Sequence, residues 1–85
     1  MKTITLYSTD YCSYCRTAKQ LLEARGLAFT EIDLTHDDDL RRTISAKAWN
    51  YRTVPMIFVG EQFIGGYDQL RELDQSGELA KMIVD

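Results

Sequence analysis

The chain has 85 residues, of which 45% are hydrophobic and 27% charged, and this balance favours a folded globular domain over a disordered chain. A net charge of -3 and the lack of a Lys/Arg cluster argue against a nucleic-acid-binding protein. No apolar run approaches the roughly 20 residues of a membrane-spanning helix, and the first residues lack the apolar stretch of a signal peptide. We therefore expect a single domain over residues 1–85, located in the cytoplasm, with no membrane contact.

The first part of the chain alternates between strand and helix patterns. Residues 3–7 alternate polar and apolar side chains, which predicts a strand. Residues 13–25 carry apolar side chains at helical spacing, and Gly26 is predicted to end this helix in a left-handed conformation. A second strand is predicted over residues 28–34. Strand, helix and strand within about 30 residues indicate a βαβ unit with parallel strands.

A second helix is predicted after Thr35, whose hydroxyl would cap its first turn. Its narrow apolar stripe consists of Leu40, Ile44 and Ala48. We expect the helix to end near Trp49 and predict a partly buried position for this indole.

The last part of the chain reads as a hairpin followed by helix. Residues 56–59 are continuously apolar, as in a central strand covered on both faces, and residues 63–64 would return antiparallel to them. Asp68 is predicted to cap a third helix, which Gly77 separates from a short terminal one. The resulting order, βαβαββα, predicts an α/β protein of the thioredoxin-like fold, with a mixed four-stranded sheet flanked by helices.

Cys12 and Cys15 lie where the first strand hands over to the first helix. A cysteine at a helix N-terminus has its thiolate stabilised by unpaired backbone N–H groups and the helix dipole. We therefore predict that Cys12 is the attacking thiol and that Cys15, one turn further on and more shielded, is the resolving thiol. A zinc site would need four ligands, and only His36 offers a further one. Inert core cysteines are a second alternative, which the polar loop before Cys12 disfavours.

Pro55 is the only proline and directly precedes the most apolar strand. It is predicted to be the first residue of that strand, since a proline further inside would remove a hydrogen bond of the sheet. Cis bonds make up only about 5–6% of X–Pro bonds, so the residues alone leave the isomer open.

Three segments taken together resemble the landmarks of the glutaredoxin family, in the same order and at similar separations. They are Cys12-Ser13-Tyr14-Cys15, Thr53-Val54-Pro55 and Gly65-Gly66-Tyr67-Asp68. The resemblance covers essentially the whole chain and points to a dithiol glutaredoxin of the Cys-Ser-Tyr-Cys type. It implies that Pro55 is cis and faces the cysteines, and that the backbone of Val54 pairs with glutathione.

The resemblance also implies an activity and partners. The protein would be a glutathione-dependent thiol–disulfide oxidoreductase that reduces protein disulfides and glutathionylated thiols, acting as a monomer through Cys12 and Cys15. Glutathione would be its co-substrate, and disulfide-containing proteins such as ribonucleotide reductase are family possibilities for its partner. The residues that would bind glutathione are Tyr14, Thr53, Val54, Pro55, Gly66, Tyr67 and Asp68.

Two positions depart from the family pattern. Thr9 stands where many glutaredoxins carry a lysine that pairs with a glutathione carboxylate, and Arg52 or Arg41 is our candidate for the missing charge. Ser13 replaces the usual proline, and serine there is associated with family members that bind a [2Fe–2S] cluster between two subunits. In this alternative Cys12 and glutathione would supply the cluster ligands.

A third alternative is a redoxin reduced by thioredoxin reductase instead of glutathione. The Gly65–Asp68 segment argues against it, because this segment is the expected loop on the glutathione side.

Overall fold

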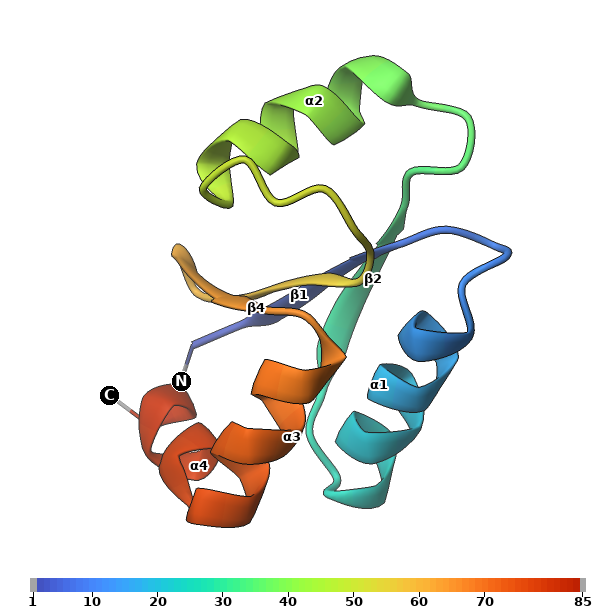
Figure 1. The fold of residues 1–85 in the computed structure, drawn as a ribbon. Coiled ribbons are helices and arrows are strands. Elements are labelled where there is room, and N and C mark those ends of the chain that lie inside the picture. Colours follow the sequence, from blue (N-terminus) through green and yellow to red (C-terminus); the bar gives the residue numbers. More distant parts are fainter. Residues whose placement is uncertain (1, 85) are drawn as a thin grey trace.

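The computed structural model describes residues 2–84 as a four-stranded sheet with helices on both faces (Figure 1). In chain order the elements are β1 (Ile4–Ser8), α1 (Ser13–Ala24), β2 (Phe29–Asp33), α2 (Asp38–Lys47), β3 (Met56–Val59), β4 (Gln62–Gly65), α3 (Tyr67–Ser76) and α4 (Glu78–Ile83). The strand order is β2-β1-β3-β4, with β1 parallel to β2, and β3 antiparallel to both β1 and β4. This arrangement confirms the predicted thioredoxin-like mixed sheet.

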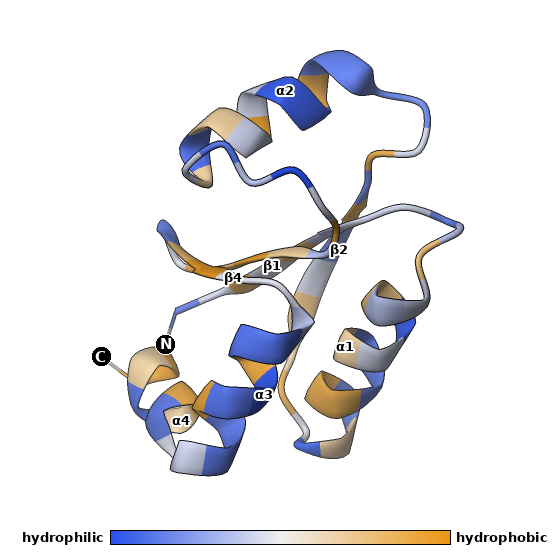
Figure 2. Ribbon diagram, viewed as in Figure 1, coloured by the Kyte–Doolittle hydropathy of each residue, from blue (hydrophilic) through white to orange (hydrophobic). Residues whose placement is uncertain are grey.

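Helix α2 covers one face of the sheet, and α1, α3 and α4 cover the other (Figure 1). Hydrophobic residues gather on the strands and on the sides of the helices that face them, while the outer surfaces are hydrophilic (Figure 2). Within the part of the chain that the structure describes, no helix is both long and apolar enough to cross a membrane.

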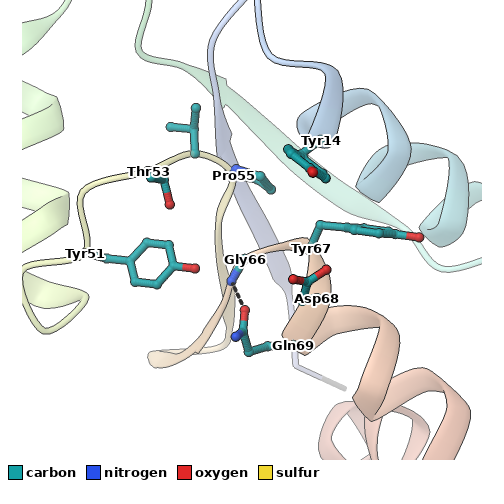
Figure 3. Close-up of a pocket in the computed structure, with 9 residues that line it drawn as sticks. Tyr14, Tyr51, Thr53, Pro55, Gly66, Tyr67, Asp68 and Gln69 are labelled. Atoms are coloured by element: carbon teal, nitrogen blue, oxygen red, sulfur yellow. Dashed lines mark hydrogen bonds between the residues drawn. The ribbon is translucent and has the colours of Figure 1, made fainter.

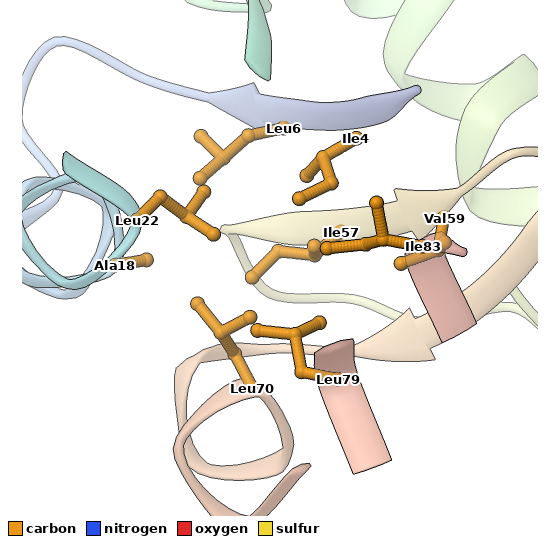
Figure 4. Close-up of a cluster of buried hydrophobic side chains, with 9 residues drawn as sticks. All are labelled: Ile4, Leu6, Ala18, Leu22, Ile57, Val59, Leu70, Leu79 and Ile83. Atoms are coloured by element: carbon orange, nitrogen blue, oxygen red, sulfur yellow. The ribbon is translucent and has the colours of Figure 1, made fainter. Parts of the chain in front are cut away.

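The larger core lies between the sheet and the three helices α1, α3 and α4 (Figure 4). Alternation along β1 directs Ile4 and Leu6 to this side, where they are 2% and 0% exposed. Their partners on β3 are Val59 and Ile57, which are equally buried. Helix side chains close the cluster, and these are Ala18, Leu22, Leu70, Leu79 and Ile83. This packing anchors the starts of α1 and α3, the two helix ends that reach the site described below.

A second, smaller core lies under α2. Ile44 and Ala48 of the predicted stripe are buried against Met56 and Phe58 of β3, and Leu40 packs at the edge of this cluster. Alternate side chains of β3 therefore enter the two cores on opposite faces of the sheet, as the continuous apolar run predicted.

The start of α2 differs from our prediction. Asp37, not Thr35, is the N-cap, and its carboxylate accepts the backbone N–H of Leu40 at 3.0 Å. The Thr35 hydroxyl is engaged elsewhere, since it donates to the Asp33 carboxylate and accepts the N–H of Asp10 at 2.9 Å. Thr35 thus ties the loop before α1 to the end of β2.

The start of α3 also differs from our prediction. Gly66 is the N-cap, with an extended backbone, and Asp68 lies inside the first turn. The N–H of Gly66 donates to the side-chain oxygen of Gln69 at 2.9 Å. Asp68 is still placed where a negative charge is favourable at a helix start.

The predicted burial of Trp49 is wrong, because its side chain is 86% exposed. Trp49 and Asn50 both adopt left-handed conformations, with φ of 61° and 62°. The chain thereby reverses after α2, and the N–H of Asn50 donates to the carbonyl of Ser45 at 2.8 Å. This reversal turns the indole outward and sends the following residues back toward the sheet.

Candidate active site

The Cys12 side chain lies between the start of α1 and the segment before β3. Cys12 is the N-cap of α1, with an extended backbone, and its Sγ accepts the backbone N–H of Cys15 at 3.1 Å. A donor directed at this sulfur stabilises the negative charge that the atom carries as a thiolate. On its other side the thiol donates to the carbonyl oxygen of Val54 at 3.4 Å. Both cysteines are free thiols.

Cys15 is far less accessible, as predicted, with 1% of its surface exposed. Burial is the main cause, and the hydrogen bond with Cys12 the second, of a rise in the pKa of the Cys15 thiol to about 12. The backbone of Thr9 and the charge of Lys19 oppose this shift of the pKa. The two thiols therefore differ in the way that an attacking and a buried resolving thiol would.

The segment before β3 brings Val54 against the first turn of α1. The Val54–Pro55 bond is cis, which confirms the isomer implied by the family resemblance. Pro55 precedes the first residue of β3, so its missing N–H removes no hydrogen bond from the sheet.

A groove of about 280 Å³ opens beside these residues (Figure 3). All seven residues predicted to bind glutathione line it, and they are Tyr14, Thr53, Val54, Pro55, Gly66, Tyr67 and Asp68. Tyr51 and Gln69 also line it, and the sequence analysis did not identify either. Three segments that are far apart in the sequence thus share one concave surface.

Two tyrosines form one wall of the groove. The rings of Tyr14 and Tyr67 stack with centroids 6.2 Å apart and planes inclined by 29°. Tyr14 remains 63% exposed, so it offers an aromatic surface to a ligand instead of filling the core.

The floor of the groove requires glycine at position 66. A Cβ on Gly66 would lie 2.9 Å from the Tyr51 hydroxyl and 3.4 Å from the Pro55 carbonyl oxygen. Gly65 has φ of 120°, and a Cβ there would lie 2.7 Å from Cγ of Gln69. Gly66 therefore lets the start of α3 approach Tyr51 and Pro55 closely, and Gly65 leaves room for the Gln69 side chain.

A second cavity, of about 360 Å³, borders both cysteines and is lined by charged groups. In it Lys19 donates to the Glu31 carboxylate at 2.8 Å, and the buried hydroxyl of Ser8 donates to the same oxygen at 2.7 Å. These two hydrogen bonds hold the pKa of Glu31 below its usual range, that from Lys19 being the larger cause. Lys19 thus links α1 to β2.

Thr9 occupies the position of the family lysine, and Arg41 and Arg52 are our candidates to replace its charge. None of the three lines the groove. Thr9 is 5% exposed, lines the second cavity, and leaves its Oγ1 without a hydrogen-bond partner. Arg41 and Arg52 line an adjoining cavity that shares only Tyr51 with the groove. The guanidinium of Arg41 donates to the carbonyl oxygen of Arg52 at 3.2 Å.

Among residues 2–84, no three His, Cys, Asp or Glu side chains come together in a group that could hold a metal ion. A four-thiolate cluster would therefore need ligands from outside this chain.

Comparison with known proteins agrees with this geometry. The glutaredoxin family model matches residues 4–64, which include both cysteines and the Thr53–Pro55 segment. A glutaredoxin of Pseudomonas aeruginosa is 39% identical over 83 residues, which cover 98% of this chain and 98% of that protein.

Solved structures agree as well. The solution structure of glutaredoxin from Brucella melitensis superposes with a TM-score of 0.85 at 34% identity, covering 98% of this chain and 89% of that one. A buckwheat glutaredoxin in complex with glutathione superposes with a TM-score of 0.82 at 31% identity, covering 96% and 76%. Since the family model, a full-length relative and the fold agree, this chain belongs to the glutaredoxin family, whose members are thiol oxidoreductases.

Proposed function

We propose that the protein is a dithiol glutaredoxin that uses glutathione to reduce glutathionylated thiols and protein disulfides. The observation that carries this proposal is the 3.4 Å contact between Sγ of Cys12 and the carbonyl oxygen of Val54. It joins the reactive sulfur to the groove lined by Thr53, Val54, Gly66 and Asp68. The similar buckwheat protein was solved in complex with glutathione, which supports the choice of ligand.

Recognition would use the backbone of Val54 and the first turn of α3. An extended peptide beside Val54 can exchange main-chain hydrogen bonds with it in the manner of an added strand. The first backbone N–H groups of α3, at Tyr67 and Asp68, suit a carboxylate of the tripeptide. Gly66 contributes space and not its N–H, because Gln69 already accepts that hydrogen.

In the first step, the Cys12 thiolate attacks the glutathionyl sulfur of a mixed disulfide. A new S–S bond forms between Cys12 and glutathione, the old bond breaks, and the substrate leaves as a thiolate that takes up a proton. A second glutathione thiolate then attacks the Cys12 adduct, which releases oxidised glutathione and restores the Cys12 thiolate.

Protein disulfides would follow a second route through Cys15. After Cys12 has formed a mixed disulfide with the substrate, Cys15 attacks Cys12, and the two are left joined as a disulfide. Two glutathione molecules then reduce this bond. Glutaredoxin potentials of about -200 to -230 mV suit the glutathione pool of the cytoplasm, where we propose that the protein acts.

The [2Fe–2S] alternative has weaker support. It rests on Ser13 alone, and this chain would contribute only Cys12 of the four thiolates. No geometric feature of the described residues favours it over disulfide exchange, so we do not propose it as the function.

A parallel assay tests the proposal. The purified protein is given a glutathionylated peptide together with either glutathione and glutathione reductase or thioredoxin reductase, both with NADPH. We expect rapid NADPH consumption only in the glutathione arm. Turnover that depends on thioredoxin reductase and is indifferent to glutathione would overturn the proposal in favour of the redoxin alternative.

A further inference from the structure

Tyr51 is the one groove residue outside the predicted segments that brings a hydroxyl to the groove. It lies four residues after the end of α2 and two residues before Thr53. Figure 3 shows its ring entering the groove from the side opposite Tyr14, with the hydroxyl directed toward Gly66.

The position of this ring is fixed by three contacts. The backbone N–H of Tyr51 donates to the carbonyl of Ala48 at 3.1 Å, and the Tyr51 carbonyl accepts the hydroxyl of Ser45. The ring packs edge-on against Phe63 of β4, with centroids 5.1 Å apart and planes inclined by 63°. A side chain held in this way can present its hydroxyl to a ligand without losing much conformational freedom on binding.

The hydroxyl reaches the part of the groove that the backbone of Gly66 and Pro55 borders. It lies 2.9 Å from the point that a Cβ of Gly66 would occupy, and the Pro55 carbonyl oxygen is 3.4 Å from the same point. Among residues 2–84, the structure gives the Tyr51 hydroxyl no hydrogen-bond partner. It is therefore free to donate to an oxygen atom of a bound molecule.

The structure assigns to Tyr51 a specificity-determining role: its hydroxyl donates a hydrogen bond to an oxygen of the glutamyl or glycyl residue of a glutathione seated in the groove. This inference rests on the proposed function and adds a residue to it. A disulfide partner that brings only a cysteine to Cys12 lacks the glutamyl and glycyl oxygens, so it cannot accept this bond. Tyr51 thus favours glutathionylated over cysteinylated substrates.

Tyr51→Phe removes the hydroxyl and retains the ring that packs against Phe63. Rates are measured with one peptide in two forms, glutathionylated and cysteinylated, by mixing each in excess with reduced protein. We expect the second-order rate constant for the glutathionylated form to fall about three- to tenfold, through weaker binding of that substrate, as for the loss of one hydrogen bond. The value for the cysteinylated form and the melting temperature should remain unchanged.

Tyr7→Phe provides the matched control. The Tyr7 ring also packs edge-on against a phenylalanine of the α2-side core, Phe58, at 5.7 Å, but it does not line the groove. This variant should keep the wild-type rates for both peptides.

Two results would overturn the inference alone. One is a wild-type preference for the glutathionylated peptide that Tyr51→Phe leaves unchanged. The other is an equal loss for both peptides, which would place the hydroxyl's effect on Cys12 or on the cysteine that both substrates share, and not on the glutamyl or glycyl residue. If the wild-type protein itself fails to prefer the glutathionylated peptide, the proposed function fails and the inference fails with it.

Discussion

The Cys12 thiol donates a hydrogen bond to the carbonyl oxygen of Val54, a residue 42 positions later in the chain. This contact joins the end of α1 that carries Cys12 to the segment that borders the groove. A ligand paired with the backbone at Val54 would hold its sulfur beside Cys12, so recognition and reaction share one location.

The two cysteines should separate into two activities. Cys12→Ser removes the attacking sulfur and should abolish reduction of both glutathionylated peptides and protein disulfides. Cys15→Ser should retain the first activity and lose the second, because only the second requires an internal disulfide. Steady-state rates with each substrate check this. Equal losses for both substrates in Cys15→Ser would contradict the assigned roles.

Alkylation should also distinguish the thiols. The pKa of Cys15, raised to about 12 by burial, leaves only on the order of 0.01% thiolate at pH 8. Iodoacetamide at that pH should therefore modify Cys12 alone, and Cys15 should react only under denaturing conditions. Peptide mass spectrometry after timed quenching gives both rates. Comparable rates at the two cysteines of the folded protein would show that Cys15 is accessible.

The start of each of α2 and α3 shows where sequence reasoning stopped short. The helices themselves were predictable from apolar spacing, but the residue that caps each of them was not. Thr35 does not cap α2, because its hydroxyl bonds to Asp33 at the end of β2 and to Asp10 in the loop before α1. No local sequence pattern indicates the bond to Asp10. Asp68 does not cap α3, because the extended backbone needed at the N-cap falls on Gly66.

The residues of the site were predictable where they belong to a sequence motif and were not predictable elsewhere. Cys12 and the Thr53–Pro55 segment belong to recognisable motifs, and the structure brings them together. Tyr51 belongs to none, and it reaches the groove through the left-handed turn at Trp49 and Asn50, which no local pattern indicates. Gln69 had a signal that the sequence analysis missed, because a Gln three residues after a helix cap often bonds back to it.

The Lys19–Glu31 pair should contribute stability in a pH-dependent way. Hydrogen bonds from Lys19 and Ser8 lower the pKa of Glu31 in the folded protein, so their contribution is present above the ordinary pKa of about 4.3 and lost as the pH falls through the folded value. Glu31→Gln should lower the free energy of unfolding by about 0.5 kcal/mol at pH 7, a value suited to a part-exposed pair.

Urea titrations at several pH values test this effect. The difference between Glu31→Gln and the wild type should shrink below about pH 4, since the wild-type carboxyl is then increasingly protonated. A difference that stays constant from pH 7 to pH 3 would mean that the charge of Glu31 is not responsible.

Gly65 should tolerate alanine less well than Gly77 does. Both have positive φ, of 120° and 83°, but a Cβ at Gly77 meets no atom within 4 Å, whereas at Gly65 it would lie 2.9 Å from Cβ of Gln69. Gly77→Ala should cost about 1 kcal/mol of unfolding free energy, from backbone strain alone. Gly65→Ala should cost roughly 1–3 kcal/mol more, because φ of 120° is less accessible to alanine than 83° and because Cβ of Gln69 cannot rotate away.

Urea unfolding of the two alanine variants gives this comparison directly. Equal losses of stability would show that backbone conformation alone makes glycine necessary at Gly65, and that the contact with Gln69 is unimportant.

The two cavities that flank the cysteines offer the most direct test of where glutathione binds. In the Cys15→Ser variant, Cys12 is converted to its mixed disulfide with glutathione, and the backbone amide shifts are compared with those of the reduced variant by NMR. The largest changes should fall at Val54, Tyr67 and Asp68, in the groove, with small ones at Lys19 and Glu31. The largest changes at Lys19 and Glu31, with Val54 and Asp68 unmoved, would place glutathione in the other cavity and contradict the account.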